Sequence, residues 1–141
     1  MSGFLLDKNC ISEVVRQNPE PRVLRWLEAT DERLLYLSVL TIGEIRNGVA
    51  SLPQSKRRTR LESWLELELQ ARFLGKVLPI EAAIAERWGI LTAAARKNGI
   101  RLGAIHGLLA ATALHFNLTL VSRNVRDFVG TPVVLLDPWT S

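Results

Sequence analysis

The stretch FLLDKNCISE, residues 4–13, opens the chain with a short apolar run that ends on an acid. Such a run, bounded by a polar residue, is typical of a strand buried inside a sheet, and a strand is predicted at residues 3–7. Residues 11–17 are predicted to form a short helix, because two prolines follow and disfavour its continuation. A buried strand that leads directly into a helix indicates an α/β protein, with Asp7 at the carboxyl end of the first strand.

The rest of the chain alternates between strand-like and helix-like segments. Further strands are predicted at residues 35–39, 75–79, 118–121 and 133–136. Further helices are predicted at residues 23–29, from residue 41 onward, and at residues 56–71, 81–97 and 104–116. Strands separated by helices pair in parallel through right-handed crossovers, and continuous apolar strands fit a sheet that is buried on both faces. The order of elements therefore predicts an α/β fold with a central parallel sheet.

Length and composition limit the classes of protein that fit. The chain has 141 residues, of which 48% are hydrophobic and 23% charged, so one compact domain over residues 1–141 is expected. The formal net charge of +4 favours an anionic partner such as nucleic acid. Cys10 is the single cysteine, which excludes an intrachain disulfide, and its apolar surroundings predict a core residue. No apolar run reaches the roughly 18 residues of a membrane span, and no signal peptide is evident, so a cytoplasmic protein is expected.

Acidic and polar residues follow the predicted strands. In parallel sheets, ligands bind beyond the carboxyl ends of the strands, where Asp7, Glu44 and Asp127 are expected to lie. Carboxylates that converge repel one another, and a hard divalent cation such as Mg²⁺ or Mn²⁺ removes that cost. Such ions commonly serve phosphoryl chemistry, and a basic protein surface suits a nucleic-acid substrate. The pattern therefore favours a metal-dependent nuclease.

Each acid also has a purely structural interpretation. Asp7 could cap the helix that follows it. Thr41 and Glu44 have the spacing of a capping box, so Glu44 could serve only its own helix end. Asp127 could lie in a turn or pair with Arg126. The acids taken singly therefore leave both interpretations open.

Five segments in register resemble one family. They are LLDKNCISE at residues 5–13, YLSVLTIGEIRNGV at 36–49, HGLLAATAL at 106–114, LTLVSRNVRDF at 118–128 and LLDPW at 135–139. Their order and spacing resemble those of PIN-domain proteins, specifically the VapC- and FitB-like toxin ribonucleases of type II toxin–antitoxin systems. The resemblance covers most of the chain and ends on the shared Pro-Trp pair.

This resemblance implies a fold, an activity and a partner. The expected fold is a three-layer α/β/α sandwich around the parallel sheet. The expected activity is Mg²⁺- or Mn²⁺-dependent cleavage of RNA. The expected assembly is a homodimer that associates further with a small VapB-like antitoxin, which binds DNA through its own domain and blocks the toxin's site.

The resemblance also assigns residues to the site. The catalytic and metal-binding positions fall on Asp7, Glu44, His106 and Asp127. Supporting polar positions fall on Lys8, Asn9, Ser122 and Asn124. Three arginines near the predicted cleft are candidates for contact with RNA, namely Arg46, Arg123 and Arg126.

Two residues depart from the family pattern. Lys8 stands where these relatives have threonine, and His106 stands where they have an aspartate regarded as a metal ligand. Together the two changes halve the formal negative charge of the site, which weakens its attraction for a cation. Their structural interpretations are a solvated lysine at a helix start and a helix histidine bonded to a neighbour.

Three hypotheses follow from these departures. The site can be active in a rearranged form, with the His106 imidazole as a Mn²⁺ ligand and the Lys8 ammonium at the scissile phosphate. It can be degenerate, with Lys8 paired to Asp7, and the protein then binds RNA or antitoxin without catalysis. It can also be an attenuated toxin. We expect a ribonuclease of full or reduced activity, with the inactive homologue as the alternative.

Overall fold

The computed structural model describes residues 2–140 and has a single sheet of five parallel strands. The strand order is β3-β2-β1-β4-β5. The strands are β1 (Phe4–Leu6), β2 (Leu35–Ser38), β3 (Val77–Leu78), β4 (Thr119–Val121) and β5 (Leu135–Leu136). In the central register Leu5 of β1 lies opposite Tyr36 of β2 and Leu120 of β4. The predicted parallel sheet is therefore confirmed.

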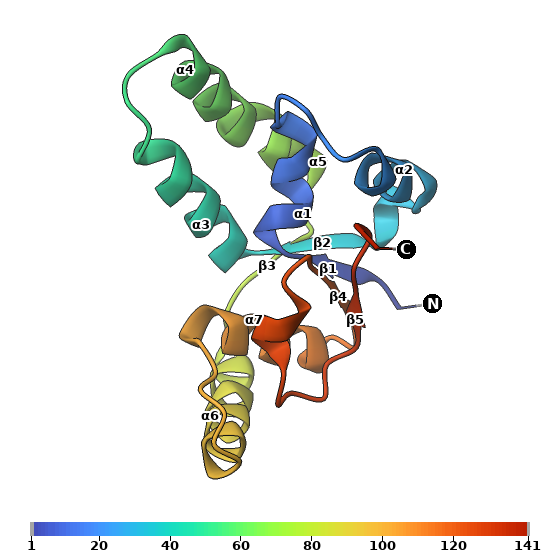
Figure 1. Ribbon diagram of the computed structural model, residues 1–141, viewed down its shortest axis with the longest axis vertical. Coiled ribbons are helices and arrows are strands. Elements are labelled where there is room, and N and C mark those ends of the chain that lie inside the picture. The colour runs from blue at the N-terminus through green and yellow to red at the C-terminus, as the bar shows by residue number, and fades with distance from the viewer. Residues whose placement is uncertain (1, 141) are drawn as a thin grey trace.

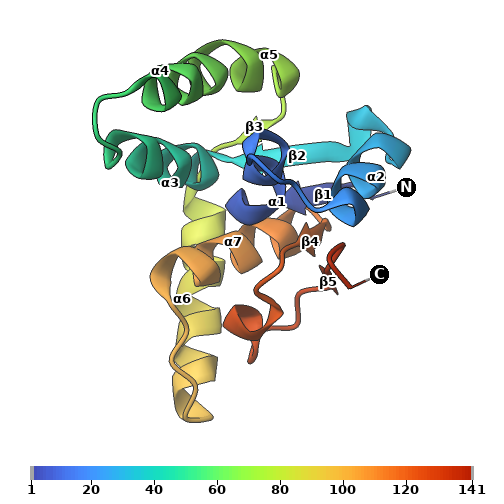
Figure 2. The ribbon, with the colours of Figure 1, turned by 45° about the horizontal axis from the view of Figure 1, so that its top comes forward.

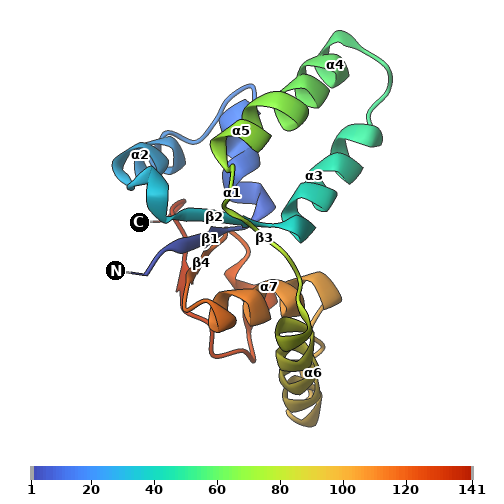
Figure 3. The same cartoon turned by 180° about the vertical axis from the view of Figure 1, so that it is seen from behind.

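Helices cover both faces of this sheet. The first layer contains α1 (Lys8–Ser12), η1 (Glu13–Val15), α2 (Pro21–Ala29), η2 (Glu32–Leu34), α3 (Val39–Ala50), α4 (Lys56–Ser63), η3 (Trp64–Leu69) and α5 (Gln70–Arg72). The second contains α6 (Ala82–Lys97), α7 (Ala104–His115) and η4 (Val125–Phe128). Figures 1 and 3 show helices α1 to α5 on one side of the sheet and α6 and α7 on the other. The arrangement is the predicted three-layer α/β/α sandwich.

The core has one cluster of buried side chains on each face of the sheet. Successive residues of a strand point to opposite faces, so Leu6 packs into the cluster that contains Phe73, whereas Leu5 packs into the cluster that contains Phe128. Cys10 is fully buried in the first cluster, as its apolar surroundings predict. Burial and the nearby Asp7 charge raise the pKa of its thiol to about 12.

Three element boundaries differ from the prediction. Helix α1 begins at Lys8 and not at Ile11, because the Asp7 side chain caps it directly after β1. Helix α3 begins at Val39 and not at Thr41, and it includes the last residue of the strand predicted at 35–39. The long helix predicted at residues 56–71 is interrupted by the π-helical segment η3, which buries Trp64, Leu65 and Leu69 against the core.

Helix α6 reaches away from the sheet further than any other element in Figure 2. It carries the exposed apolar side chain of Ile90, which is 71% accessible.

None of the helices in residues 2–140 has the length and apolar character needed to cross a membrane.

Candidate active site

Asp7 lies at the carboxyl end of β1 and is only 4% exposed. Its Oδ1 accepts a hydrogen bond of 2.8 Å from the Lys8 backbone N–H and so caps α1. Its Oδ2 accepts a bond of 2.8 Å from the Ser122 hydroxyl. A carboxylate oxygen has two lone pairs, so each oxygen of Asp7 can still accept another ligand. Capping, the structural interpretation of Asp7, is therefore correct and does not exclude a role in binding.

The supporting polar residues form one network around Ser122, which is fully buried at the end of β4. Its hydroxyl oxygen accepts hydrogen bonds from the Asn124 backbone N–H at 3.0 Å and from Asn9 Nδ2 at 3.4 Å. The Asn9 carbonyl oxygen, Oδ1, accepts one from the Arg123 backbone N–H at 3.3 Å. These bonds join the segments that follow β1 and β4 and hold Asp7 in a fixed orientation. The structure brings Asn9, Ser122 and Asn124 together, and their supporting role in the site stays a prediction.

Glu44 lies within α3 and does not cap it. The helix begins at Val39, and the Ser38 hydroxyl caps it by accepting a bond of 3.0 Å from the Leu40 N–H. The capping-box interpretation of Thr41 and Glu44 is therefore wrong. The Glu44 side chain is 17% exposed, and within residues 2–140 its Oε1 is buried without a hydrogen-bond partner. A buried carboxylate oxygen without a donor is costly, so this oxygen is suited to receive a cation.

The charges around Glu44 connect the predicted site residues. Burial raises the pKa of Glu44, and the negative charge of Asp7 raises it as well. Lys8 and, more weakly, His106 lower the same pKa. Asp7, Lys8 and His106 therefore all act electrostatically on Glu44.

Lys8 extends over this site from the start of α1. Its Nζ is 3.8 Å from Glu44 Oε2, and its side chain is 52% exposed. The hypothesis that Lys8 pairs with Asp7 is corrected: only the Lys8 backbone N–H binds Asp7, whereas the ammonium approaches Glu44. Residues adjacent in sequence at a helix start point in different directions, which explains the difference.

His106 and Asp127 form a second contact between a basic and an acidic side chain of the site. His106 Nε2 in α7 is 3.5 Å from Asp127 Oδ2 in η4, and both side chains are partly exposed. The imidazole also packs edge-on against Phe128, with ring centroids 5.3 Å apart. In the described residues Asp127 forms this contact and no ion pair with Arg126. Of its two structural interpretations, the turn is therefore correct, because Asp127 lies in η4, and the Arg126 pair is not. The His106 imidazole thus faces a neighbouring acid, but no hydrogen bond joins the two side chains in the described residues.

A divalent metal ion fits part of this site. No three His, Cys, Asp or Glu side chains within residues 2–140 are grouped so that together they hold a metal ion. Mg²⁺, however, is usually bound by one or two carboxylates, with water and substrate phosphate as the remaining ligands. Asp7 and Glu44 supply two carboxylates, and Oε1 of Glu44 is the free oxygen. These two residues fit a hard divalent cation, whereas Asp127 already faces His106.

The three arginines predicted to contact RNA differ in the contacts that already hold their guanidinium groups. Arg46 donates a bond of 3.0 Å to Glu66. The Arg123 guanidinium lies over the Trp139 ring, 5.6 Å from its centroid. Arg126 is exposed and has no ion pair in the described part of the chain. Arg126 is thus the guanidinium most available to a phosphate.

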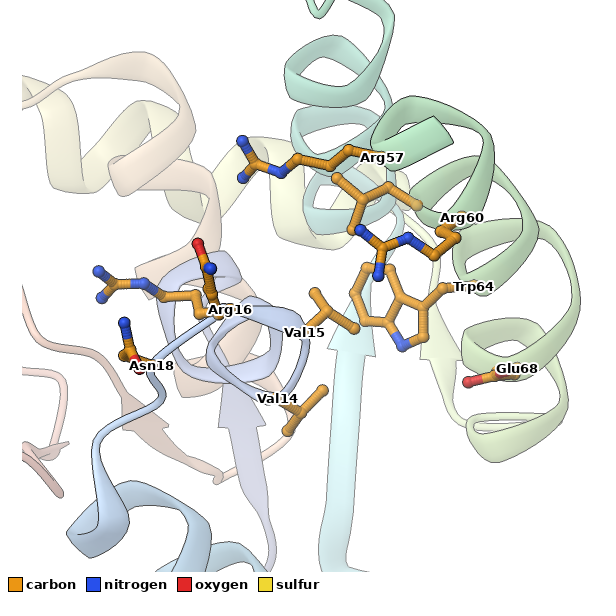
Figure 4. Close-up of a pocket in the computed structure, with 10 residues that line it drawn as sticks. Val14, Val15, Arg16, Asn18, Arg57, Arg60, Trp64 and Glu68 are labelled. Atoms are coloured by element: carbon orange, nitrogen blue, oxygen red, sulfur yellow. The ribbon is translucent and has the colours of Figure 1, made fainter. Parts of the chain in front are cut away.

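The sequence did not reveal a hollow of about 770 Å³ between the segment after α1 and helix α4. Figure 4 shows Val15 and Trp64 at its base, with Arg16 on one side and Arg57 and Arg60 on the other. None of the predicted catalytic residues lines it. Its two sides lie some forty residues apart in the chain, and no local sequence pattern indicates that they meet.

Comparison with known proteins agrees with this architecture. The sequence model of the PIN domain family matches residues 4–131 of this chain. Toxin FitB of Neisseria gonorrhoeae is 35% identical, over 96% of this chain and 98% of FitB. VapC ribonuclease Y4jK of Sinorhizobium fredii is 34% identical, over 96% of this chain and 97% of Y4jK. The solved structure of FitAB bound to an IR36 DNA fragment contains a chain with a TM-score of 0.91 and 33% identity, covering 96% of this chain and 95% of that one. This chain therefore belongs to the PIN-domain family, in its branch of FitB- and VapC-type toxins.

Proposed function

We propose that this chain is the toxin of a toxin–antitoxin pair and that it cleaves RNA with the help of Mg²⁺ or Mn²⁺. The observation that carries the proposal is the unpartnered, buried Oε1 of Glu44 in α3, beside the buried Asp7 that follows the central strand β1 and acts electrostatically on Glu44. The relatives named toxin and ribonuclease match this chain over nearly their whole length, which supports the same role here. An RNA substrate implies that the protein acts in the cytoplasm.

The residues of the site divide the work. Asp7 and Glu44 would hold the metal ion, which activates water and stabilises the leaving oxygen when it is bound. Ser122 and the Lys8 backbone N–H keep the Asp7 carboxylate oriented. Asp127 orients the His106 imidazole at the edge of the site. Arg126, with Arg123 and Arg46, supplies positive charge for the RNA backbone, where contacts require charge and not a specific base.

We propose that the antitoxin binds in the hollow of Figure 4. Its apolar base, with Val15 and Trp64, can take an apolar side chain, and the guanidinium groups of Arg57 and Arg60 can take acidic ones. Neither arginine forms an ion pair within the described residues. An acidic segment with apolar anchors is the partner of matching chemistry. We further propose that the toxin forms a homodimer and that antitoxin joins these dimers into a larger assembly.

Cleavage of a structured RNA by the purified protein in Mn²⁺, with and without EDTA, tests the proposed activity. Asp7→Asn should abolish cleavage, because it removes one of the two carboxylates that hold the ion. Asp31→Asn is the matched control, since Asp31 is exposed and pairs with Arg33 away from the site. Cleavage by Asp7→Asn at the rate of the parent would show that the site is wrongly assigned.

A second candidate function is a PIN homologue without catalysis that binds antitoxin or RNA. The specific observation in its favour is that two of the three acids already face a basic side chain, Glu44 with Lys8 and Asp127 with His106. Under this alternative the parent protein neither binds Mn²⁺ nor cuts RNA in its presence. A parent protein that cuts, and that EDTA stops, excludes it.

A further inference from the structure

The Lys8–Glu44 contact is the feature of the site that its proposed chemistry does not explain. The ammonium lies 3.8 Å from Glu44 Oε2 and is half-exposed, whereas the other oxygen of Glu44 is buried without a donor. Within residues 2–140 no hydrogen bond and no second ion pair holds the Lys8 ammonium. Its position therefore depends on Glu44 alone.

This ion pair is asymmetric in what each partner requires. The Glu44 side chain is 17% exposed, and within residues 2–140 its Oε1 has no donor, so a nearby cation stabilises its charged form. Lys8 is well hydrated and can turn into solvent without exposing apolar core. A long, exposed pair of this kind is weak. The ammonium can therefore leave, provided another cation replaces it at Glu44.

A divalent ion is the natural replacement, but the two cations exclude each other. A metal held by Asp7 and Glu44 would lie a few ångströms from an ammonium placed against Glu44, and like charges at that separation repel strongly in a partly buried site. The same carboxylate cannot be neutralised fully by both. Occupancy by one cation thus lowers the affinity for the other.

We propose that Lys8 is a tethered counter-cation, which competes with a divalent metal ion for Glu44 and yields it when a backbone phosphate of RNA draws the ammonium away. The inference rests on the proposed metal-dependent ribonuclease. It makes metal and RNA bind cooperatively, and by linkage the increase in affinity is the same in both directions. The protein alone then holds metal weakly, and metal is retained mainly where substrate is present.

Binding of Mn²⁺ to the purified full-length chain, followed by calorimetry and by electron paramagnetic resonance, tests this without reference to cleavage. Lys8→Met keeps the length of the side chain and removes its charge. It should bind Mn²⁺ roughly 10- to 100-fold more tightly than the parent, the range expected when a unit charge about 5 Å from a divalent ion is removed and solvent screens the half-exposed ammonium strongly, at an effective dielectric constant of about 50–80. Lys97→Met is the matched control: it changes net charge equally, lies at the far end of α6 and should leave the affinity unchanged.

A second arm tests the coupling with phosphate backbone. An oligo-dT of ten nucleotides should tighten Mn²⁺ binding by the parent and by Lys97→Met. It should have little effect on Lys8→Met, in which position 8 has no ammonium for the phosphate to draw away. Asp7→Asn combined with Lys8→Met should lose the gain in affinity, which assigns the ion to this site. Thermal unfolding of each variant checks that the fold is retained.

The outcomes separate this inference from the proposed function. Equal Mn²⁺ affinity in the parent and Lys8→Met overturns the competition by Lys8 and leaves the metal site in place. An affinity that oligo-dT raises equally in both proteins overturns the coupling through Lys8. No detectable Mn²⁺ binding by any variant, Lys8→Met included, overturns both this inference and the metal dependence of the proposed ribonuclease.

Discussion

Ser122→Ala isolates the hydrogen bond that orients Asp7. The substitution removes a donor from the buried Oδ2 of Asp7, to which the Ser122 hydroxyl donates at 2.8 Å. A hydrogen bond to a charged group contributes about 1.5–3 kcal/mol, and both residues are buried, so water does not readily replace the hydroxyl. The bonds that Ser122 accepts from Asn9 Nδ2 and from the Asn124 backbone N–H contribute less, because Asn9 is partly exposed and Asn124 is exposed, so water can satisfy both donors. We expect a loss of about 2 kcal/mol in the free energy of unfolding.

The assay is chemical and thermal unfolding of four proteins. They are the parent, Ser122→Ala, Asp7→Asn and the double variant that carries both substitutions. A loss of about 2 kcal/mol corresponds to a fall of roughly 8 °C in Tm for a domain of this size. Ser51→Ala is the control, since its hydroxyl only donates to a backbone carbonyl in an exposed helix end, and it should change stability by less than about 0.5 kcal/mol. In a double-mutant cycle with Asp7→Asn, the two substitutions should be non-additive by about 1 kcal/mol or more. Additive losses, or a Tm for Ser122→Ala equal to that of Ser51→Ala, would refute the view that this hydroxyl acts on Asp7.

Three further outcomes follow from the structure. Cys10 should not react with a thiol reagent at pH 8 in the native protein and should react on unfolding. Folding raises the pKa of this thiol from 9.0 to about 12, so its contribution to stability is complete below pH 9 and is lost as the pH rises toward 12. Unfolding curves at alkaline pH measure this loss. Gly3→Ala should destabilise the fold by about 2 kcal/mol or more, because an added Cβ would lie 2.5 Å from the Leu34 carbonyl oxygen, and denaturant unfolding measures the loss. His106→Asp should raise Mn²⁺-dependent RNA cleavage by roughly 10-fold or more, since it adds a carboxylate beside Asp127; an unchanged rate would mean that position 106 does not contribute to the metal site.

The sequence was most informative where local pattern and buried position agree. The apolar run before Asp7 predicts both a central strand and a residue at its carboxyl end, and the structure has both. By sequence, Asp7 could be a helix cap or a site residue. In the structure the cap uses a single lone pair of Oδ1, so the same carboxylate can still bind a ligand. The alternatives were therefore not exclusive.

The sequence was misleading where a local pattern imitated another. The Thr41–Glu44 spacing matches a capping box, but α3 begins earlier, at Val39, and Ser38 caps it. The error arises because apolar residues at the start of α3 are indistinguishable by pattern from the end of the preceding strand. It matters because removing the capping role leaves Glu44 free for the site.

Contacts between distant segments could not be predicted from local pattern. By sequence, an ion pair with its neighbour Arg126 was one alternative for Asp127, whereas it faces His106 from another element. The hollow lined by Arg57 and Arg60 likewise forms only when α4 packs against the segment after α1. In each case the partner is chosen by the tertiary fold, and sequence adjacency carries no information on it.

The two departures from the family pattern have related effects once their positions are known. Lys8 and His106 come from different helices, yet each places a basic group against a site acid, Glu44 in one case and Asp127 in the other. A site whose own lysine lies against Glu44 is less dependent on metal for its stability, since that carboxylate is partly neutralised in the free protein. The same neutralisation weakens the attraction for a metal ion, so a gain in stability without metal is linked to a loss in metal affinity. If Lys8 yields Glu44 to the ion in the presence of a phosphate backbone, this linkage would restrict the nuclease to its substrate-bound state, and a toxin with that property would be least active where no RNA occupies its site.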